Sequence, residues 1–157
     1  MNAKKSKKQP KSFEVSVELR ELAEKVIKTE GMDLSPAKIE YLLVYPNISK
    51  TVAGRCIRAS EELKFFSDND YLIEISGELY DSMDDQTRYI LLYHELMHVL
   101  PLMDDQTGDY KYTIRQHDLQ DFSRVINKYG VDWINQIKLT VSSLYDLSPK
   151  SEDSIKI

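Results

Sequence analysis

The residues of this chain best suited to chemistry form the string His94-Glu95-Leu96-Met97-His98. Residues four positions apart share one face of a helix, so His94 and His98 can direct their imidazoles at one point in space. Glu95 lies beside that point on the same helix. Two neutral imidazoles and an adjacent carboxylate are what a catalytic zinc site with a general base requires. The string therefore predicts a small zinc-dependent peptidase.

The third ligand to this single catalytic zinc ion is expected to be His117, the remaining histidine of the chain. Three protein ligands leave the fourth tetrahedral position open to water, as in catalytic rather than structural zinc sites. Zinc lowers the pKa of such a water to about 7, and Glu95 would take its proton during attack on a peptide carbonyl. Asp118 and Asp121 compete with His117 as third ligand, or could accept the free N–H of a ligand histidine.

Three further roles are open to residues outside the motif. Tyr110 or Tyr112 could donate a hydrogen bond to the transition-state oxyanion, although packing is the more ordinary role in a chain with ten tyrosines. Cys56 is expected to be a small core residue, because no histidine remains to activate it as a nucleophile. The substrate would be held extended by strand addition, on a hairpin predicted over residues 62–76.

The motif lies within a helix predicted from about Gln86 to Leu100, capped by Asp84 or Asp85 and ended by Pro101. This helix is apolar nearly all round, which indicates that it is buried. Its polar interior residues are those of the motif, and buried polar groups need partners or a metal.

The other elements follow from hydrophobic periodicity and turn residues. Gly54 marks a bulge or a close approach within its strand, and the segment 101–116 is expected to be a loop. The predicted helices cover residues 16–30, 117–128 and 133–146, and the predicted strands cover residues 39–45, 51–59, 62–66 and 71–76.

Charge is unevenly distributed along the chain. Five lysines lie in residues 1–11, and without them 16 basic residues face 26 acidic ones, a net charge of −10. An acidic body argues against broad binding to nucleic acid. The lysine-rich start could make a weak contact with nucleic acid or an acidic partner, but a solvated tail is the more ordinary interpretation.

One domain is expected over residues 13–147, between a disordered lysine-rich tail (1–12) and a polar tail (148–157). The start lacks the apolar run of a secretory signal, and no segment approaches the ~18 apolar residues of a membrane span. Cys56, the single cysteine, has no disulfide partner within the chain and fits a reducing compartment. The expected location is therefore the cytoplasm, with no membrane partner.

These motifs together resemble the phage metallopeptidase family, small zincin-like proteins of phages and prophages, over roughly residues 40–135. The resemblance implies an α+β zincin-like fold: a small twisted, mostly antiparallel sheet packed on the motif helix and flanking helices. It also implies His94, His98 and His117 as zinc ligands, Glu95 as catalytic base, and a protein or peptide substrate in a bacterial host. A catalytically silent zinc-binding regulatory or interaction protein is the alternative. The matching segments are Phe65-Phe66-Ser67, residues 71–75, residues 86–88, residues 94–98, residues 117–122 and Tyr129-Gly130.

Overall fold

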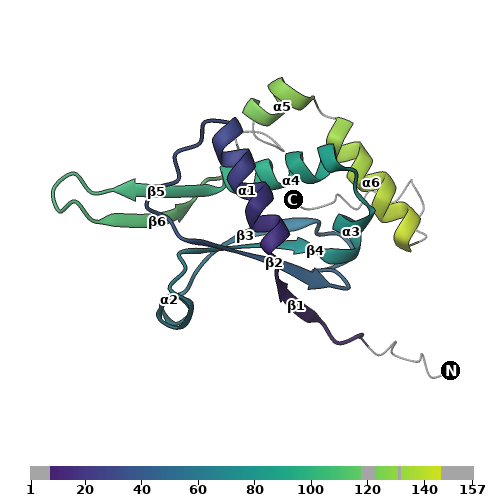
Figure 1. The fold of residues 1–157 in the computed structure, drawn as a ribbon, viewed down its shortest axis with the longest axis horizontal. Helices are drawn as coiled ribbons and strands as arrows, with labels where there is room; N and C mark the ends of the chain where they lie inside the picture. The colour runs from purple at the N-terminus through teal and green to yellow at the C-terminus, as the bar shows by residue number, and fades with distance from the viewer. Residues whose placement is uncertain (1–7, 118–122, 131, 146–157) are drawn as a thin grey trace.

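A computed structural model of the chain describes residues 8–117, 123–130 and 132–145. It is an α+β protein built on a four-stranded mixed sheet of order β1-β2-β4-β3 (Figure 1). The inner strands β2 and β4 run parallel, whereas the outer pairs β1–β2 and β4–β3 are antiparallel. The predicted α+β class with a small, mostly antiparallel sheet is therefore confirmed. The strands are β1 Ser12–Val15, β2 Ile39–Tyr45, β3 Gly54–Arg58 and β4 Tyr71–Ser76.

The helix that carries the histidine pair is α4, Asp85–Met97. Asp84 is its N-cap: the carboxylate accepts a hydrogen bond of 2.7 Å from the N–H of Thr87, which satisfies one of the free donors of the first turn. Every residue from Ile90 to Met97 is buried. The predicted burial of this helix is confirmed.

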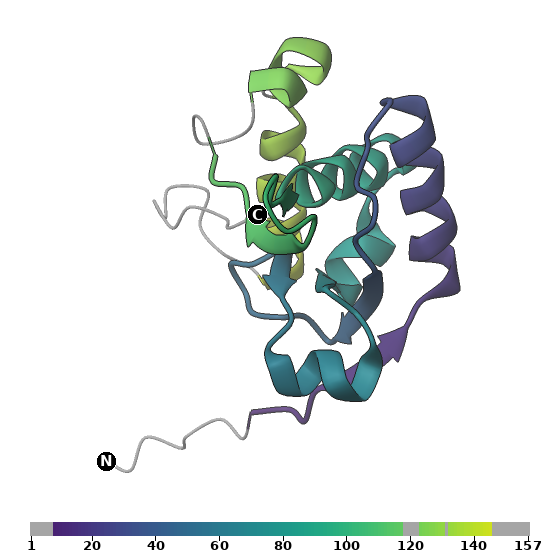
Figure 2. The ribbon, with the colours of Figure 1, turned by 90° about the vertical axis from the view of Figure 1, so that its left-hand side faces the viewer.

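Helix α4 lies above one face of the sheet, with helices on both of its sides. On one side is α1 (Val17–Thr29), whose buried stripe is Leu19, Ala23 and Val26. On the other is α6 (Asp132–Tyr145), and Figure 2 shows α1 in purple and α6 in yellow-green flanking α4. The sequence predicted both of these helices, including Ser16 as the N-cap of α1.

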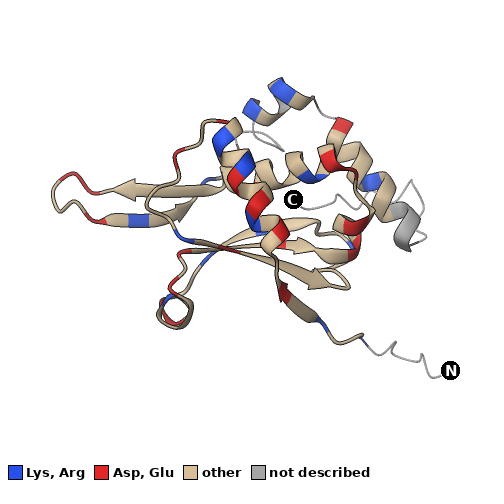
Figure 3. Cartoon of the chain, in the orientation of Figure 1, with Lys and Arg blue, Asp and Glu red and all other residues tan. Residues whose placement is uncertain are grey.

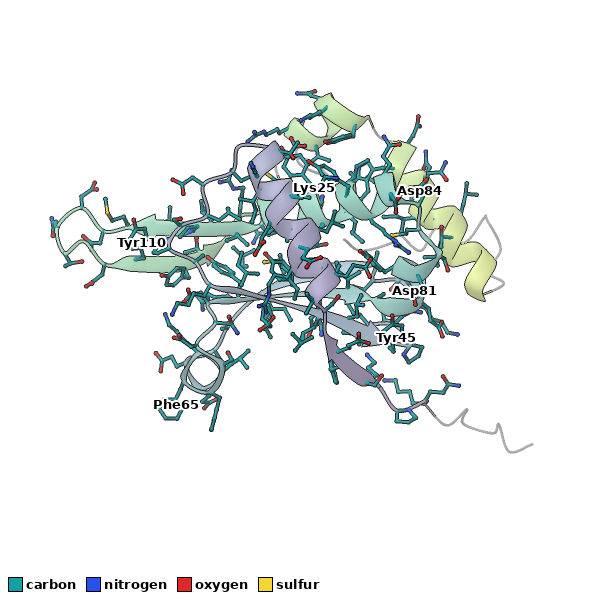
Figure 4. All side chains as sticks on the ribbon, viewed as in Figure 1. Lys25, Tyr45, Phe65, Asp81, Asp84 and Tyr110 are labelled. Carbon is teal, nitrogen blue, oxygen red and sulfur yellow. The ribbon has the colours of Figure 1, made fainter. Side chains whose placement is uncertain are left out.

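The hairpin predicted over residues 62–76 is wrong. Residues Glu61–Ser67 form a helix, α2, and only β4 is a strand. The Ser60 side chain caps α2, and two glutamates in the first turn favour its N-terminus electrostatically. Phe65 and Phe66, which suggested a strand, are 83% and 84% exposed, and Figure 4 shows Phe65 directed away from the body of the protein.

The predicted extension of the motif helix to Leu100 and the loop over residues 101–116 are also wrong. Helix α4 ends at Met97, and the chain continues directly into β5 (Val99–Met103), which pairs antiparallel with β6 (Tyr110–Ile114). This two-stranded hairpin projects from the body of the protein (Figure 1). It returns the chain from its tip to the end of α4, beside the histidine pair.

The remaining described helices are α3 (Gly77–Ser82) and α5 (Ser123–Tyr129). The second half of the helix predicted over residues 117–128 corresponds to α5. Residues 118–122, in its first half, lie outside the described residues, as do residues 1–7 and 148–157 of the predicted tails. Strand β1 was not predicted, and its first residue falls within the proposed tail; the domain boundaries stay a prediction. None of the described helices is long and apolar enough to span a bilayer.

Candidate metal centre

Three histidines from two parts of the chain converge at the end of α4. The Nε2 atom of His117 lies 2.9 Å from Nε2 of His94 and 3.0 Å from Nε2 of His98. The ligand atoms of all three lie within 4.8 Å of one another. His94 is fully buried, and the other two side chains are half-buried. The sequence predicted this set, and the structure brings it together.

The arrangement fits a metal ion by its donor set. Imidazole nitrogens that share one zinc ion at about 2.0–2.1 Å stand about 3.3 Å apart in a tetrahedral arrangement, and the two distances to His117 are close to this spacing. Three nitrogen donors and no carboxylate ligand among the described residues suit zinc, although other transition metals accept the same donors. The cluster could therefore hold a metal ion.

The orientation of two of the rings is fixed by neighbours. The Nδ1–H of His98 donates to the carbonyl oxygen of Arg115 at 2.7 Å, which leaves the lone pair of Nε2 directed at the cluster. The N–H of Arg115 in turn donates to the carbonyl of His98 at 2.8 Å. The His94 ring lies 5.5 Å from the ring of Trp133 of α6, between centroids. Neither neighbour was predicted, and a backbone carbonyl leaves no signal in a sequence.

Glu95 follows His94 on α4 and its side chain is turned toward the sheet. The residue is fully buried, and an added Cβ on Gly54 of β3 would lie only 2.9 Å from its Oε1 atom. The close approach predicted at Gly54 is thus the contact between β3 and this carboxylate. Burial raises the pKa of the nearby Cys56 thiol, and the charge of Glu95 adds to the rise. Cys56 packs against the core as a protonated thiol, in line with the structural role expected for it.

The strand beside Glu95 is an edge of the sheet. Strand β3 pairs with β4 on one side, and on the other it has no strand partner in the part of the chain that the structure describes. The hairpin predicted to supply such an edge is wrong, because its first half is helix α2 and its second half, β4, lies inside the sheet between β2 and β3. The edge strand next to Glu95 is therefore β3.

Four other candidate residues of the site are Asp118, Asp121, Tyr110 and Tyr112. Asp118 and Asp121 lie outside the described residues, so neither is placed. Tyr112 packs edge-on against Tyr71, with ring centroids 5.9 Å apart, and Tyr110 stacks on Tyr112 at 6.5 Å. Figure 4 shows Tyr110 far out on the projecting hairpin. The oxyanion role stays a prediction, and the contacts described for both tyrosines are packing contacts.

Comparison with known proteins supports the family that the motifs suggest. The family model described as "Putative phage metallopeptidase" matches residues 11–145, a longer stretch than the resemblance over roughly 40–135. No curated protein and no solved structure matches the chain. The match spans well over half of the 157 residues and includes all three histidines. The chain belongs to the family described as putative phage metallopeptidases.

Proposed function

We propose that the protein is a zinc-dependent peptidase whose zinc ligands are His94, His98 and His117 and whose general base is Glu95. The observation that carries the proposal is the convergence of three Nε2 atoms next to a buried carboxylate on the same helix. Zinc bound there would supply a Lewis acid and lower the pKa of a water molecule to about 7.

The role of Glu95 follows from its position. Its carboxylate would accept a proton from the attacking water and deliver it to the amine that leaves when the peptide bond breaks. Burial keeps bulk water away from the carboxylate, and the wall formed by Gly54 brings backbone, not a side chain, against it. Proton transfer at such a positioned group contributes about 100-fold or more to rate.

The edge strand β3 offers a way to hold the substrate. Its outer N–H and C=O groups could pair with an extended peptide by strand addition, next to Glu95 at its Gly54 end. Such pairing uses only main-chain groups, so it would align many sequences in the same register without selecting among them. The substrate is therefore proposed to be an extended or unfolded segment of a protein.

The substitution Glu95→Gln tests this function, because it removes the base and retains the shape of the side chain. Wild-type protein loaded with one equivalent of zinc is expected to cleave a fluorescently labelled, unfolded protein such as casein. Glu95→Gln is expected to retain zinc, measured by elemental analysis, and to lose turnover by about 100-fold or more.

Two outcomes would contradict the proposal. Normal turnover by Glu95→Gln would exclude the assigned base. Tight zinc binding by the wild type without cleavage of any unfolded substrate would favour the alternative, a metal-binding protein that acts through interactions. His117→Ala is the matching control for the metal, since it removes a proposed ligand and leaves Glu95 in place.

A further inference from the structure

A second polar cluster joins three helices at the other end of the molecule from the β1 edge. Its centre is Glu30, the C-cap of α1, whose side chain is 1% exposed. The carboxylate accepts hydrogen bonds from the hydroxyl of Tyr89 on α4 at 2.9 Å and from Tyr129 on α5 at 2.6 Å. The ammonium of Lys128, also on α5, lies 2.6 Å away. We call these four residues, with Arg124, the Glu30 cluster.

In the part of the chain that the structure describes, the Glu30 cluster provides the polar attachment of α5 to the rest of the protein, and Figure 3 shows the basic residues of α5 in blue. Three of its five members lie on α5, since Arg124 donates to the main-chain carbonyl of Glu30 at 2.7 Å. Among the α5 side chains that the structure describes, only Val125 is fully buried. Apolar burial of one valine stabilises by about 1.5–3 kcal/mol. Tyr129 adds packing, since its ring lies edge-on to those of Tyr89 and Tyr93, at 6.2 Å between centroids in each pair. The described polar contacts that dock α5 all end on Glu30.

The position of His117 depends in turn on the chain segments that precede and follow it. His94 lies in the last turn of α4 and His98 caps the same helix, so the helix itself places both. His117 belongs to no described helix or strand. On its N-terminal side, the paired hydrogen bonds between Arg115 and His98 hold the chain. On its C-terminal side, the next described element is α5, which begins six residues later.

We propose that Glu30 is a positioning residue of the metal centre: by docking α5 onto α1 and α4, it holds His117 in place as the third ligand. None of the contacts described for Glu30 is with one of the three histidines, so Glu30 acts through α5. A buried carboxylate suits this role because it accepts several hydrogen bonds at once, and each bond to a charged acceptor is stronger than one between neutral groups. The inference rests on the proposed metal centre, and it does not require peptidase activity.

The test is the metal affinity and the geometry of the bound ion in Glu30→Ala. Zinc affinity is measured by competition with a chromophoric chelator, and it is expected to fall about tenfold or more, as when groups that orient metal ligands are removed. Cobalt(II) is the second probe, because its visible spectrum reports the number and kind of ligands. The cobalt spectrum of Glu30→Ala is expected to move toward that of His117→Ala.

The matched control is Asp70→Ala. Asp70 is another buried carboxylate, which accepts from the N–H of Lys38 at 2.8 Å and pairs with Lys64 at 2.8 Å, but none of these residues is on α5. Its loss should destabilise the fold and leave zinc affinity unchanged when both variants are measured well below their melting temperatures. Glu30→Gln, which keeps one acceptor oxygen, should restore part of the lost affinity.

Two results would overturn the inference: wild-type zinc affinity in Glu30→Ala, or an equal loss in Asp70→Ala. A wild-type protein that binds no zinc at all would instead refute the metal centre. A wild type that binds zinc without cleaving peptides would refute the peptidase activity alone, and the comparison of the two alanine variants would still decide the role of Glu30.

Discussion

Gly54 and Glu95, 41 positions apart in the chain, lie in direct contact where the edge strand meets the motif helix. A Cβ atom at position 54 would lie 2.9 Å from Oε1 of Glu95 and 2.9 Å from Cδ1 of Ile75. Both distances are shorter than van der Waals contact. Gly54 has ordinary strand geometry, so the absence of a side chain matters here for space and not for backbone conformation.

Gly54→Ala is therefore expected to displace the Glu95 carboxylate and to lower kcat about tenfold or more, because misplacing a catalytic group by about 1 Å can cost 100-fold. Zinc content should stay at wild-type level, since the atoms nearest to the added Cβ belong to Glu95 and Ile75 and not to a histidine. Steady-state kinetics and elemental analysis of the same preparation would check both statements.

The control for Gly54→Ala is Gly108→Ala, at the tip of the projecting hairpin. There a Cβ would meet nothing within 4 Å, but the backbone φ of 74° strains any other residue, at a cost of about 1 kcal/mol. Gly108→Ala should lower stability and spare turnover. If Gly54→Ala lost no activity, the carboxylate would not be held in its catalytic position by this contact.

Metal binding should raise thermal stability, because the ligands come from α4 and from a segment that follows β6. A ligand at 100 times its Kd stabilises the folded state by about 2.7 kcal/mol, which corresponds to about 5–10 °C in the melting temperature of a domain of this size. Differential scanning fluorimetry with zinc and with a chelator measures the shift. His117→Ala should lose most of it, and an unchanged melting temperature in wild type would contradict a bound metal.

The exposed aromatic pair of α2 should contribute little to folding. Phe65 and Phe66 contact each other edge-on at 5.4 Å and otherwise face solvent. Replacing both by serine is expected to change the free energy of unfolding by about 0.5 kcal/mol or less. Tyr71→Ser, at a fully buried aromatic residue, should lower the free energy of unfolding by about 3–5 kcal/mol. Urea titrations of both variants would measure these changes. A comparable loss in the double variant would show that α2 packs on the core.

The two inner strands of the central sheet could be predicted well from sequence. Apolar and β-branched runs bounded by turn residues mark β2 and β4, and the predicted limits 39–45 and 71–76 equal those of the structure. The parallel pairing of β2 with β4 could not be predicted. Parallel strands are joined by a long crossover connection, and its length does not indicate which residues of the two strands lie opposite each other. The assignment of the edge strand failed for two reasons: residues 62–66 are helical, and the position of β4 in the sheet depends on strand order and not on local pattern.

The errors around the motif have a local cause. Val99 and Leu100 continue the apolar run of α4, and such a run does not distinguish a last helical turn from the start of a strand. Pro101 indicated a helix end, but it is also tolerated in the two-stranded hairpin, where it pairs with Tyr112. The ligand spacing within α4 could be predicted because it depends only on helix geometry. The contacts of Glu95 with β3 and of His98 with Arg115 depend on tertiary structure.

The Glu30 cluster should make stability depend on pH in the acidic range. Burial alone would raise the pKa of Glu30, but hydrogen bonds from Lys128, Tyr129 and Tyr89 outweigh it and lower the pKa below the ordinary value of 4.5. A carboxyl whose pKa is lowered on folding stabilises the protein above its ordinary pKa, and this contribution is lost as the pH falls through the lowered value. Glu30→Gln cannot titrate, so it lacks this contribution at every pH.

The difference in unfolding free energy between wild type and Glu30→Gln is thus expected to be largest above pH 4.5 and to shrink as the pH falls through the lowered pKa of Glu30. Urea titrations with a chelator present, so that metal binding does not contribute, would measure it. Asp68→Asn is the comparison: the pKa of Asp68 is also lowered by Lys38, but that pair is exposed. Its smaller effect should vanish in about 1 M salt, where exposed charges are screened within about 3 Å. The effect of Glu30 on the free energy of unfolding should persist in high salt, because its carboxylate is enclosed by its hydrogen-bond donors. If high salt also removed the difference between wild type and Glu30→Gln, the Glu30 cluster would be open to solvent.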